Sequence, residues 1–162
     1  MLIRPAVLAD LPEFARIYDA AKVYMRASGN PNQWTTVYPD PETLTEDIDA
    51  ARLYAVEEAG RVHGVFALIP GIEPSYAVID GAWPNDLPYA TIHRIASDGQ
   101  IHGVFSTCAD FAKARHNAVR IDTHADNKTM QHLAAKHGFV RCGIVQLENI
   151  GPRIAYQWTK ED

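Results

Sequence analysis

Gln100-Ile101-His102-Gly103-Val104-Phe105 is the most informative segment of this chain. An apolar run at residues 92–97 precedes it and predicts a strand, and residues 104–115 have the apolar spacing of an amphipathic helix. A glycine-bearing turn between a strand and a helix start presents free N–H groups at the positive end of the helix dipole. This arrangement suits a pyrophosphate, and Gly103 lets the main chain approach the anion closely.

A second helix start follows at Asp126-Asn127-Lys128-Thr129-Met130. It comes directly after a predicted strand at residues 119–123, and Asn127 is a favoured N-cap residue. The helix runs to His137, where Gly138 supplies the left-handed stop that ends many helices. The second half of the chain therefore alternates between strands and helices.

Further elements surround this region. Asp10 with Glu13 has the form of a capped helix start, and Asp40-Pro41-Glu42 opens another helix. Other strands are predicted at residues 2–5, 53–57, 61–69, 76–80, 89–97, 139–145 and 153–159. Strands and helices in this mixed order predict an α/β or α+β domain with one central sheet, formed as a single domain by residues 1–162.

These landmarks resemble the Gcn5-related N-acetyltransferase (GNAT) family. Its acyl-CoA signature is Gln/Arg-x-x-Gly-x-Gly/Ala, and Gln100 and Gly103 match it, whereas Phe105 replaces the last small residue. The Asp-Asn helix start and the sequence Lys136-His137-Gly138-Phe139 follow in the family's order. The resemblance spans nearly the whole chain and implies a mixed, mostly antiparallel sheet whose two middle strands splay apart to admit acetyl-CoA.

The resemblance also assigns the contacts to acetyl-CoA, most of them through the main chain. The strand before the signature holds the thioester, which maps to Ile95, Ala96 and Ser97. Asn127 maps to a residue that touches the pantetheine arm, and it also serves as a helix cap. The pyrophosphate contacts map to Gln100, Ile101, His102, Gly103, Val104 and Phe105.

The general base is predicted at His93, since several family members carry a His or Glu at this place on the strand. Strict alternation would point His93 to the same face of the sheet as Ile95, and a structural histidine is the other interpretation. The family's general acid is a tyrosine whose position is Ala134 here. Tyr156 and Cys142 are the substitutes, unless the thiolate leaves unassisted.

The amine acceptor is expected beside an aromatic loop that contains Trp34 and Tyr38, together with Trp83 and with His124 near the strand end. A lid over the core is the other interpretation of this loop. A wall of Trp and Tyr can hold a cation against aromatic faces, which favours a small cationic or aromatic amine.

Charge and composition narrow the class of protein. A formal net charge of −5 argues against a general nucleic-acid binder. Apolar runs are too short to span a bilayer and no export signal is seen, so a cytoplasmic protein with reduced Cys108 and Cys142 is expected. Asp122 and His124 lack a third ligand at suitable spacing, so no metal is expected.

The sequence thus predicts a cytoplasmic N-acetyltransferase that moves an acetyl group from acetyl-CoA to a primary amine of a small molecule or peptide. Two alternatives stay open: a non-catalytic acyl-CoA-binding module, and an acetyltransferase that acts on the lysine or N-terminus of a protein. No membrane or nucleic-acid partner is expected, and a homodimer stays open.

Overall fold

The computed structural model describes residues 1–161. An eight-stranded sheet runs through the molecule in the order β1-β2-β3-β5-β6-β8-β7-β4. Its strands are β1 (Leu2–Pro5), β2 (Leu53–Glu58), β3 (Arg61–Pro70), β4 (Ile79–Gly81), β5 (Ala90–Ser97), β6 (Ala118–Thr123), β7 (Val140–Leu147) and β8 (Gly151–Thr159). The helices are α1 (Leu11–Ala27), α2 (Pro41–Asp49), α3 (Val104–Lys113) and α4 (Lys128–Lys136), with 3-10 turns at η1 (Leu8–Asp10) and η2 (Pro74–Tyr76).

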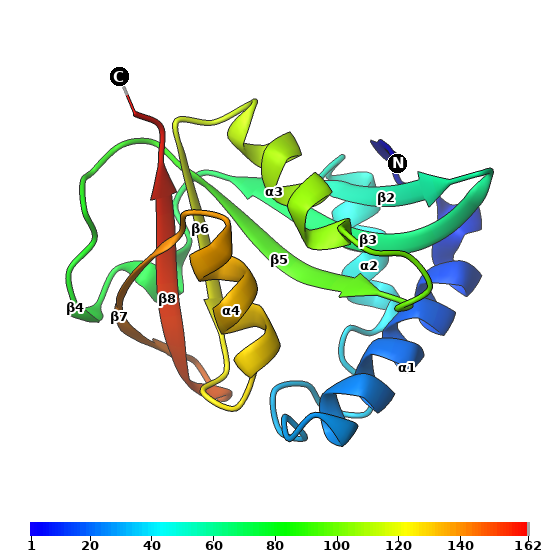
Figure 1. Ribbon diagram of the computed structural model, residues 1–162, viewed down its shortest axis with the longest axis horizontal. Coiled ribbons are helices and arrows are strands. Elements are labelled where there is room, and N and C mark those ends of the chain that lie inside the picture. The colour runs from blue at the N-terminus through cyan, green and yellow to red at the C-terminus, as the bar shows by residue number, and fades with distance from the viewer. Residues whose placement is uncertain (162) are drawn as a thin grey trace.

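Helices cover both faces of the sheet (Figure 1). Helices α3 and α4 pack on one face over a core that contains Phe66, Phe105 and Tyr156. Helices α1 and α2 pack on the other face, where Phe14 and Leu44 join a second apolar cluster. The apolar stripe predicted for residues 104–115 therefore faces the sheet, as the 3.6-residue period requires.

The two middle strands splay apart. β5 and β6 are parallel neighbours, and they pair only at Ala90–Val119 and Thr91–Arg120. Beyond Thr91, β5 continues beside β3 on its other edge, while β6 stays paired with β8 along its length. The predicted mixed, mostly antiparallel sheet with splayed middle strands is confirmed.

A β-bulge interrupts β5 at the splay. Val65 of β3 faces Ala96, yet Ala67 faces His93, so the β5 side holds an additional residue. Arg94 takes a left-handed φ of 53° there. Ile95 therefore packs on the same core as Ile92, and His93 belongs to the opposite face. The expectation that His93 and Ile95 share a face was wrong, because an added residue reverses the alternation.

The predicted helix starts have mixed outcomes. Asp40 and Asn127 accept hydrogen bonds from Thr43 N and Met130 N, as N-caps do. Asp10 does not cap α1, since its carboxylate accepts from Val7 N and from Arg4. Tyr76 ends the 3-10 turn η2 instead of beginning a strand, because Pro74 sets the turn.

No helix within residues 1–161 is long and apolar enough to cross a membrane.

Candidate functional site

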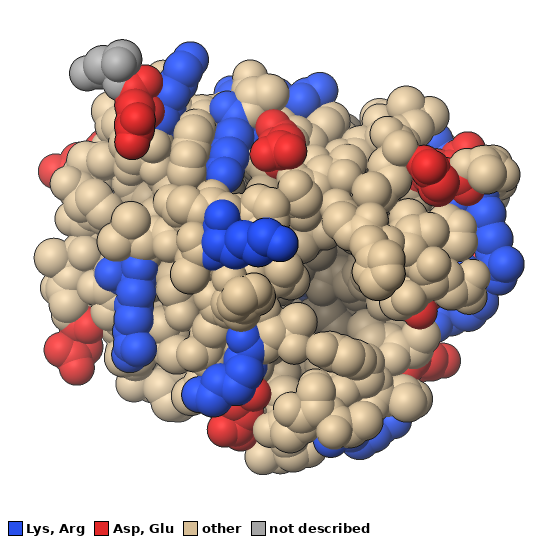
Figure 2. Space-filling view, in the orientation of Figure 1, with Lys and Arg blue, Asp and Glu red and all other residues tan. Residues whose placement is uncertain are grey.

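A cavity of about 640 Å³ opens where β5 and β6 diverge. The space-filling view shows this hollow between α4 and the α1 side of the molecule (Figure 2). Its walls come from β5, β6, the first turn of α4, the second half of α1 and the loop between α1 and α2. The separation of β5 from β6 thus opens this recess.

The β5 wall carries the residues predicted to hold a thioester. Ile95, Ala96 and Ser97 all line the cavity, as do Asp98 and Gly99 just beyond the strand. Because β6 pairs with β5 only as far as Thr91, the edge of β5 facing the cavity has no strand partner. Main-chain donors and acceptors on such an edge are available to a ligand.

The start of α3 lies at the mouth of the cavity. Gly103 precedes the helix with a left-handed φ of 83° and provides no side-chain cap. Residues 101–106 donate no main-chain hydrogen bond to any residue within 1–161. Phe105 is the one member of the predicted phosphate cradle that lines the cavity, so the cradle continues outward from its mouth. Free N–H groups at a helix start attract anions.

Asp98 shapes the turn before this cradle. Its side chain, 1% exposed, accepts from Gln100 N and lies 3.0 Å from both Arg16 and His63. Burial raises the pKa of Asp98, but the bonds from Gln100, Arg16 and His63 outweigh it and hold the pKa below its usual value. The charge of the Asp98 carboxylate is therefore balanced by the residues that donate hydrogen bonds to it.

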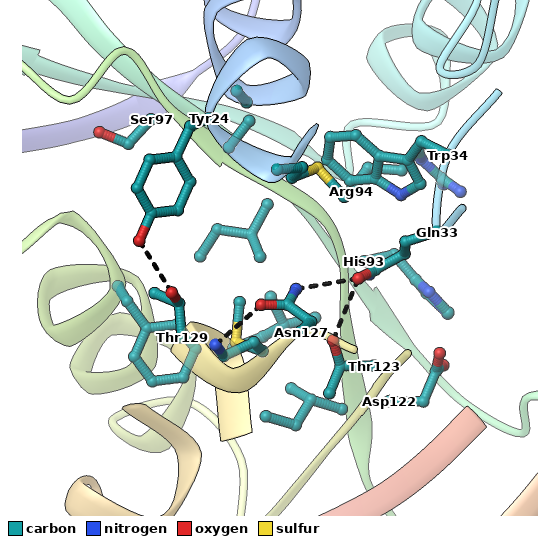
Figure 3. Close-up of a pocket in the computed structure, with 18 of the residues that line it drawn as sticks. Tyr24, Gln33, Trp34, His93, Arg94, Ser97, Asp122, Thr123, Asn127 and Thr129 are labelled. Carbon is teal, nitrogen blue, oxygen red and sulfur yellow. Dashed lines mark hydrogen bonds between the residues drawn. The ribbon is translucent and has the colours of Figure 1, made fainter. Parts of the chain in front are cut away.

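The loop between α1 and α2 covers one side of the cavity and forms a lid over it. Gln33 Oε1 accepts hydrogen bonds from Asn127 Nδ2 at 2.9 Å and from Thr123 Oγ1 at 3.3 Å (Figure 3). Arg153 donates to the main-chain oxygen of Gln33 at 3.1 Å. Asn127, predicted to touch a pantetheine arm, lines the cavity and joins this lid to α4.

His93 also lines the cavity, although its side chain lies on the face of the sheet opposite to that of Ile95. Its Nε2 lies 3.3 Å from Oε2 of Glu73, in the segment between β3 and η2. This hydrogen bond is the largest cause that lowers the pKa of Glu73, to about 2. The carboxylate is therefore ionised throughout the physiological range.

Two neighbours complete the surroundings of His93. The Tyr76 ring lies 6.5 Å from the imidazole, and its hydroxyl donates to Asp122 on β6. Burial, followed by the charge of Asp122, raises the pKa of Tyr76 well above its usual value. Tyr76 therefore stays protonated and donates the hydrogen bond, while Asp122, which accepts it, lines the cavity.

An aromatic wall stands opposite the α4 side. Trp34 and Tyr38 both line the cavity, with ring centroids 6.3 Å apart. Arg94 donates to the Tyr38 hydroxyl at 3.2 Å and pairs with the fully buried Asp47 at 2.6 Å. The bulge residue of β5 is therefore fixed from the α2 side.

Outside the predicted phosphate cradle, three residues predicted at the site do not reach the cavity. Trp83 donates to Tyr76 O and stacks on Arg120, with 3.7 Å from the guanidinium carbon to the ring centroid. His124 accepts from Asp126 N at the strand end. Tyr156 is 5% exposed and packs in the core beneath α3 and α4. Cys142, named as an alternative, also lies outside the cavity lining.

Other residues that line the cavity, or that contact a residue lining it, were missed by reasoning from the sequence. Gln33 begins the predicted aromatic loop at residues 33–38, and Tyr24 lies near the end of the helix that precedes this loop, so position alone could have suggested both. Glu73 is 20 positions from His93, and Arg153 is 120 positions from Gln33. Nothing in local spacing predicts either of these long-range contacts.

No group of three or more His, Cys, Asp or Glu side chains within residues 1–161 is arranged to hold a metal ion.

Solved structures of acetyltransferases match the whole fold. An acetyltransferase of the GNAT family from Streptococcus agalactiae 2603 is 31% identical, with 99% of this chain and 96% of that chain covered and a TM-score of 0.86. A putative acetyltransferase from Staphylococcus aureus Mu50 is 27% identical, with 98% of this chain and 99% of that chain covered and a TM-score of 0.72. The NatC complex bound to Gag peptide and CoA shares the fold at 13% identity, with coverage of 99% and 98% and a TM-score of 0.61.

No family model matches the sequence, and a search of curated proteins finds no match either. The structural relative from Streptococcus agalactiae is nevertheless similar in sequence over nearly its full length. The fold, the splayed strands and the sequence similarity all indicate the same family. The chain belongs to the GNAT family of acetyltransferases.

Proposed function

We propose that this protein transfers the acetyl group of acetyl-CoA to a primary amine by direct attack. The observation that carries the proposal is the open edge of β5 beyond Thr91, which faces a cavity of about 640 Å³. A cavity of this size holds an extended ligand arm and a small acceptor together. Holding both reactants in one recess is itself a large catalytic effect.

Acetyl-CoA fits the groups that this cavity offers. The main chain of Ile95, Ala96 and Ser97 supplies donors and acceptors for the thioester and the pantetheine arm. The free N–H groups of residues 101–106 suit the pyrophosphate. Lys and Arg side chains over α3 and α4 lie beside the hollow and favour an anionic ligand (Figure 2). Binding of CoA by the NatC complex, which shares this fold, adds support.

Acetyl-CoA supplies an activated acetyl group, and side chains of the cavity bind and deprotonate the acceptor amine. His93 lines the cavity and is the imidazole best placed to take a proton from the acceptor ammonium. The amine nitrogen then bonds to the thioester carbon and the carbon–sulfur bond breaks, with the electron pair leaving on sulfur. A second N–H proton balances the thiolate that is released.

We assign no side chain as general acid. Ala134, at the place of the family's tyrosine, is fully buried, and Tyr156 and Cys142 lie outside the cavity lining. Thiols ionise near pH 8.5, so a thiolate is a far better leaving group than an alkoxide. Departure of the CoA thiolate without assistance is consistent with this arrangement.

The acceptor is proposed to be a small cationic or aromatic amine. Trp34 and Tyr38 provide aromatic faces in the cavity, and Asp122 provides a carboxylate on its β6 side. Aromatic faces and a carboxylate both attract an ammonium group. The Gln33 bonds that close the lid over this end favour a small molecule over a protein tail.

Calorimetry with acetyl-CoA, followed by thiol release with a panel of amines, tests the proposal. We expect CoA uptake and turnover with at least one small amine. Failure to bind CoA or acetyl-CoA would overturn the proposal. Binding without thiol release for any amine would favour a non-catalytic acyl-CoA-binding module, and turnover with peptides alone would favour a protein acetyltransferase.

A further inference from the structure

We propose that Glu73 is a positioning residue that fixes the tautomer of His93, so that Nδ1 of the imidazole is the atom that accepts the proton of the acceptor amine. This inference rests on the proposed function. Glu73 is not among the residues that line the cavity, and it contacts His93 from behind. Its role is therefore to act through the histidine.

The Glu73 carboxylate is held at both oxygens. Oε2 lies 3.3 Å from His93 Nε2, and Oε1 accepts from Ser75 N at 3.2 Å. A carboxylate fixed in this way has little freedom to follow a rotating imidazole. The imidazole must instead adopt the orientation that meets the carboxylate.

The main chain at Glu73 is fixed to the strand that carries His93. The Tyr89 hydroxyl accepts from Glu73 N at 2.9 Å, and the Tyr89 carbonyl oxygen accepts from Gly71 N at 3.0 Å. Tyr89 immediately precedes β5, four positions before His93. Carboxylate and imidazole therefore share one structural frame, although they are 20 positions apart in the sequence.

This geometry determines which nitrogen carries the proton. An ionised carboxylate only accepts hydrogen bonds, so the Nε2 that meets it must bear hydrogen in the neutral imidazole. Nδ1 then holds the free lone pair. It makes no hydrogen bond to any residue within 1–161, and the ring lines the cavity. The basic nitrogen is thus left for a ligand.

The other polar and charged groups around His93 bind partners other than the imidazole. The Tyr76 ring packs 6.5 Å away, and its hydroxyl is used by Asp122. Arg94, the next residue on β5, turns to Asp47. Glu73 is therefore the anion in direct contact with the imidazole.

The proton balance follows from the tautomer. One ammonium proton moves to Nδ1, which turns the imidazole into an imidazolium with hydrogen on both nitrogens. Glu73 remains ionised and stabilises that cation across the Nε2 hydrogen bond. Deprotonation of the imidazolium by solvent after the transfer restores the starting tautomer.

A purely structural role for Glu73 is the rival interpretation, because the same carboxylate caps the short turn η2. The two roles differ in their effect on the imidazole. A turn anchor would influence stability alone, whereas a positioning residue determines the protonation pattern of His93.

The test is ¹⁵N-histidine NMR above pH 7.5 on the full chain, with steady-state kinetics, for the wild type, Glu73→Gln and Tyr89→Phe. Glu73→Gln keeps the size of the side chain and removes its charge. Tyr89→Phe loosens the loop and leaves the carboxylate intact, so it serves as the control. His93→Gln identifies the His93 signals.

We expect His93 to show the Nε2–H tautomer in the wild type and in Tyr89→Phe, and a mixture in Glu73→Gln. We also expect kcat of Glu73→Gln to fall about 10- to 100-fold, with KM for acetyl-CoA nearly unchanged. An Nδ1–H tautomer in the wild type would overturn the inference, and so would an unchanged tautomer and kcat in Glu73→Gln. A lack of turnover with every amine would overturn the proposed function instead, which the tautomer measurement distinguishes.

Discussion

The hydroxyl of Tyr24 on α1 lies 2.8 Å from Oγ1 of Thr129 on α4, so a hydrogen bond spans the recess between the two halves of the sheet (Figure 3). Both residues line the cavity. Together with Gln33, which bonds to Thr123 and Asn127, this contact joins the α1 side to the α4 side where the strands themselves have separated.

Tyr24→Phe is expected to lower the free energy of unfolding by less than about 1 kcal/mol, because the lost hydrogen bond is exposed to water. Tyr18→Phe on the same helix is the matched comparison. Tyr18 is 2% exposed and donates to Arg94 O at 2.7 Å, so its loss should cost about 1–3 kcal/mol. Denaturant titrations measure both losses, and equal losses would contradict the difference in burial between the two hydrogen bonds.

Gly103→Asp should weaken CoA binding about 10- to 100-fold, because a carboxylate at the α3 start repels the pyrophosphate. Gly103→Asn is the control, since Asn and Asp tolerate the left-handed φ of 83° similarly and differ only in charge. Calorimetry with CoA compares them. Equal affinities for the two variants would remove the pyrophosphate from this helix start.

His93→Ala should lower kcat by about 10²-fold while the dissociation constant for acetyl-CoA changes little, since the imidazole acts on the acceptor. His132→Ala, an exposed position on α4 outside the cavity lining, controls for the loss of a histidine. Thiol release and calorimetry measure the two quantities. Equal turnover by both variants would exclude His93 as the base.

Arg94→Gly should be more stable than Arg94→Ala by roughly 0.5–1 kcal/mol, because only glycine adopts φ = 53° without strain. Both variants lose the ion pair with the fully buried Asp47, which keeps its second ion pair with Arg52, and should be destabilised by about 1.5–3 kcal/mol against the wild type. Denaturant unfolding gives both differences. An alanine variant that is the more stable of the two would argue against backbone strain at the bulge.

Acid should reduce the stabilising contribution of Glu73. The pKa of this carboxyl falls from 4.5 to about 2 in the folded chain, chiefly through the hydrogen bond with His93. Because the folded state favours the ionised form, the contribution is complete above about pH 4.5 and is lost as the pH falls toward 2. The stability difference between wild type and Glu73→Gln should shrink over that window, as thermal unfolding at stepped pH would measure.

The strand and helix pattern was largely predictable because local periodicity and caps determine it. Asp40 and Asn127 begin their helices with the side-chain bonds expected from their residue types. The order of the family's elements predicted Ile95, Ala96 and Ser97 at the site, and all three line the recess, while their contact with acetyl-CoA stays a prediction.

The remaining features arise from long-range contacts. Arg94 carries no sequence signal for a bulge, and its left-handed backbone is held by Asp47 from a distant helix. Trp83 was expected near the acceptor because it is aromatic, yet Arg120 and Tyr76 bind it elsewhere. Aromatic character alone does not tell a cavity wall from a packed surface.

The short β5–β6 pairing places stability and activity in conflict. Extending the ladder beyond Thr91 would add main-chain hydrogen bonds and close the recess at the same time. Selection for heat resistance alone would therefore favour substitutions that extend the pairing of β5 with β6, and these substitutions would lower turnover. A screen that demands both properties should find its stabilising changes on β1, β2 or the outer surfaces of the helices, and leave the gap in the middle of the sheet intact.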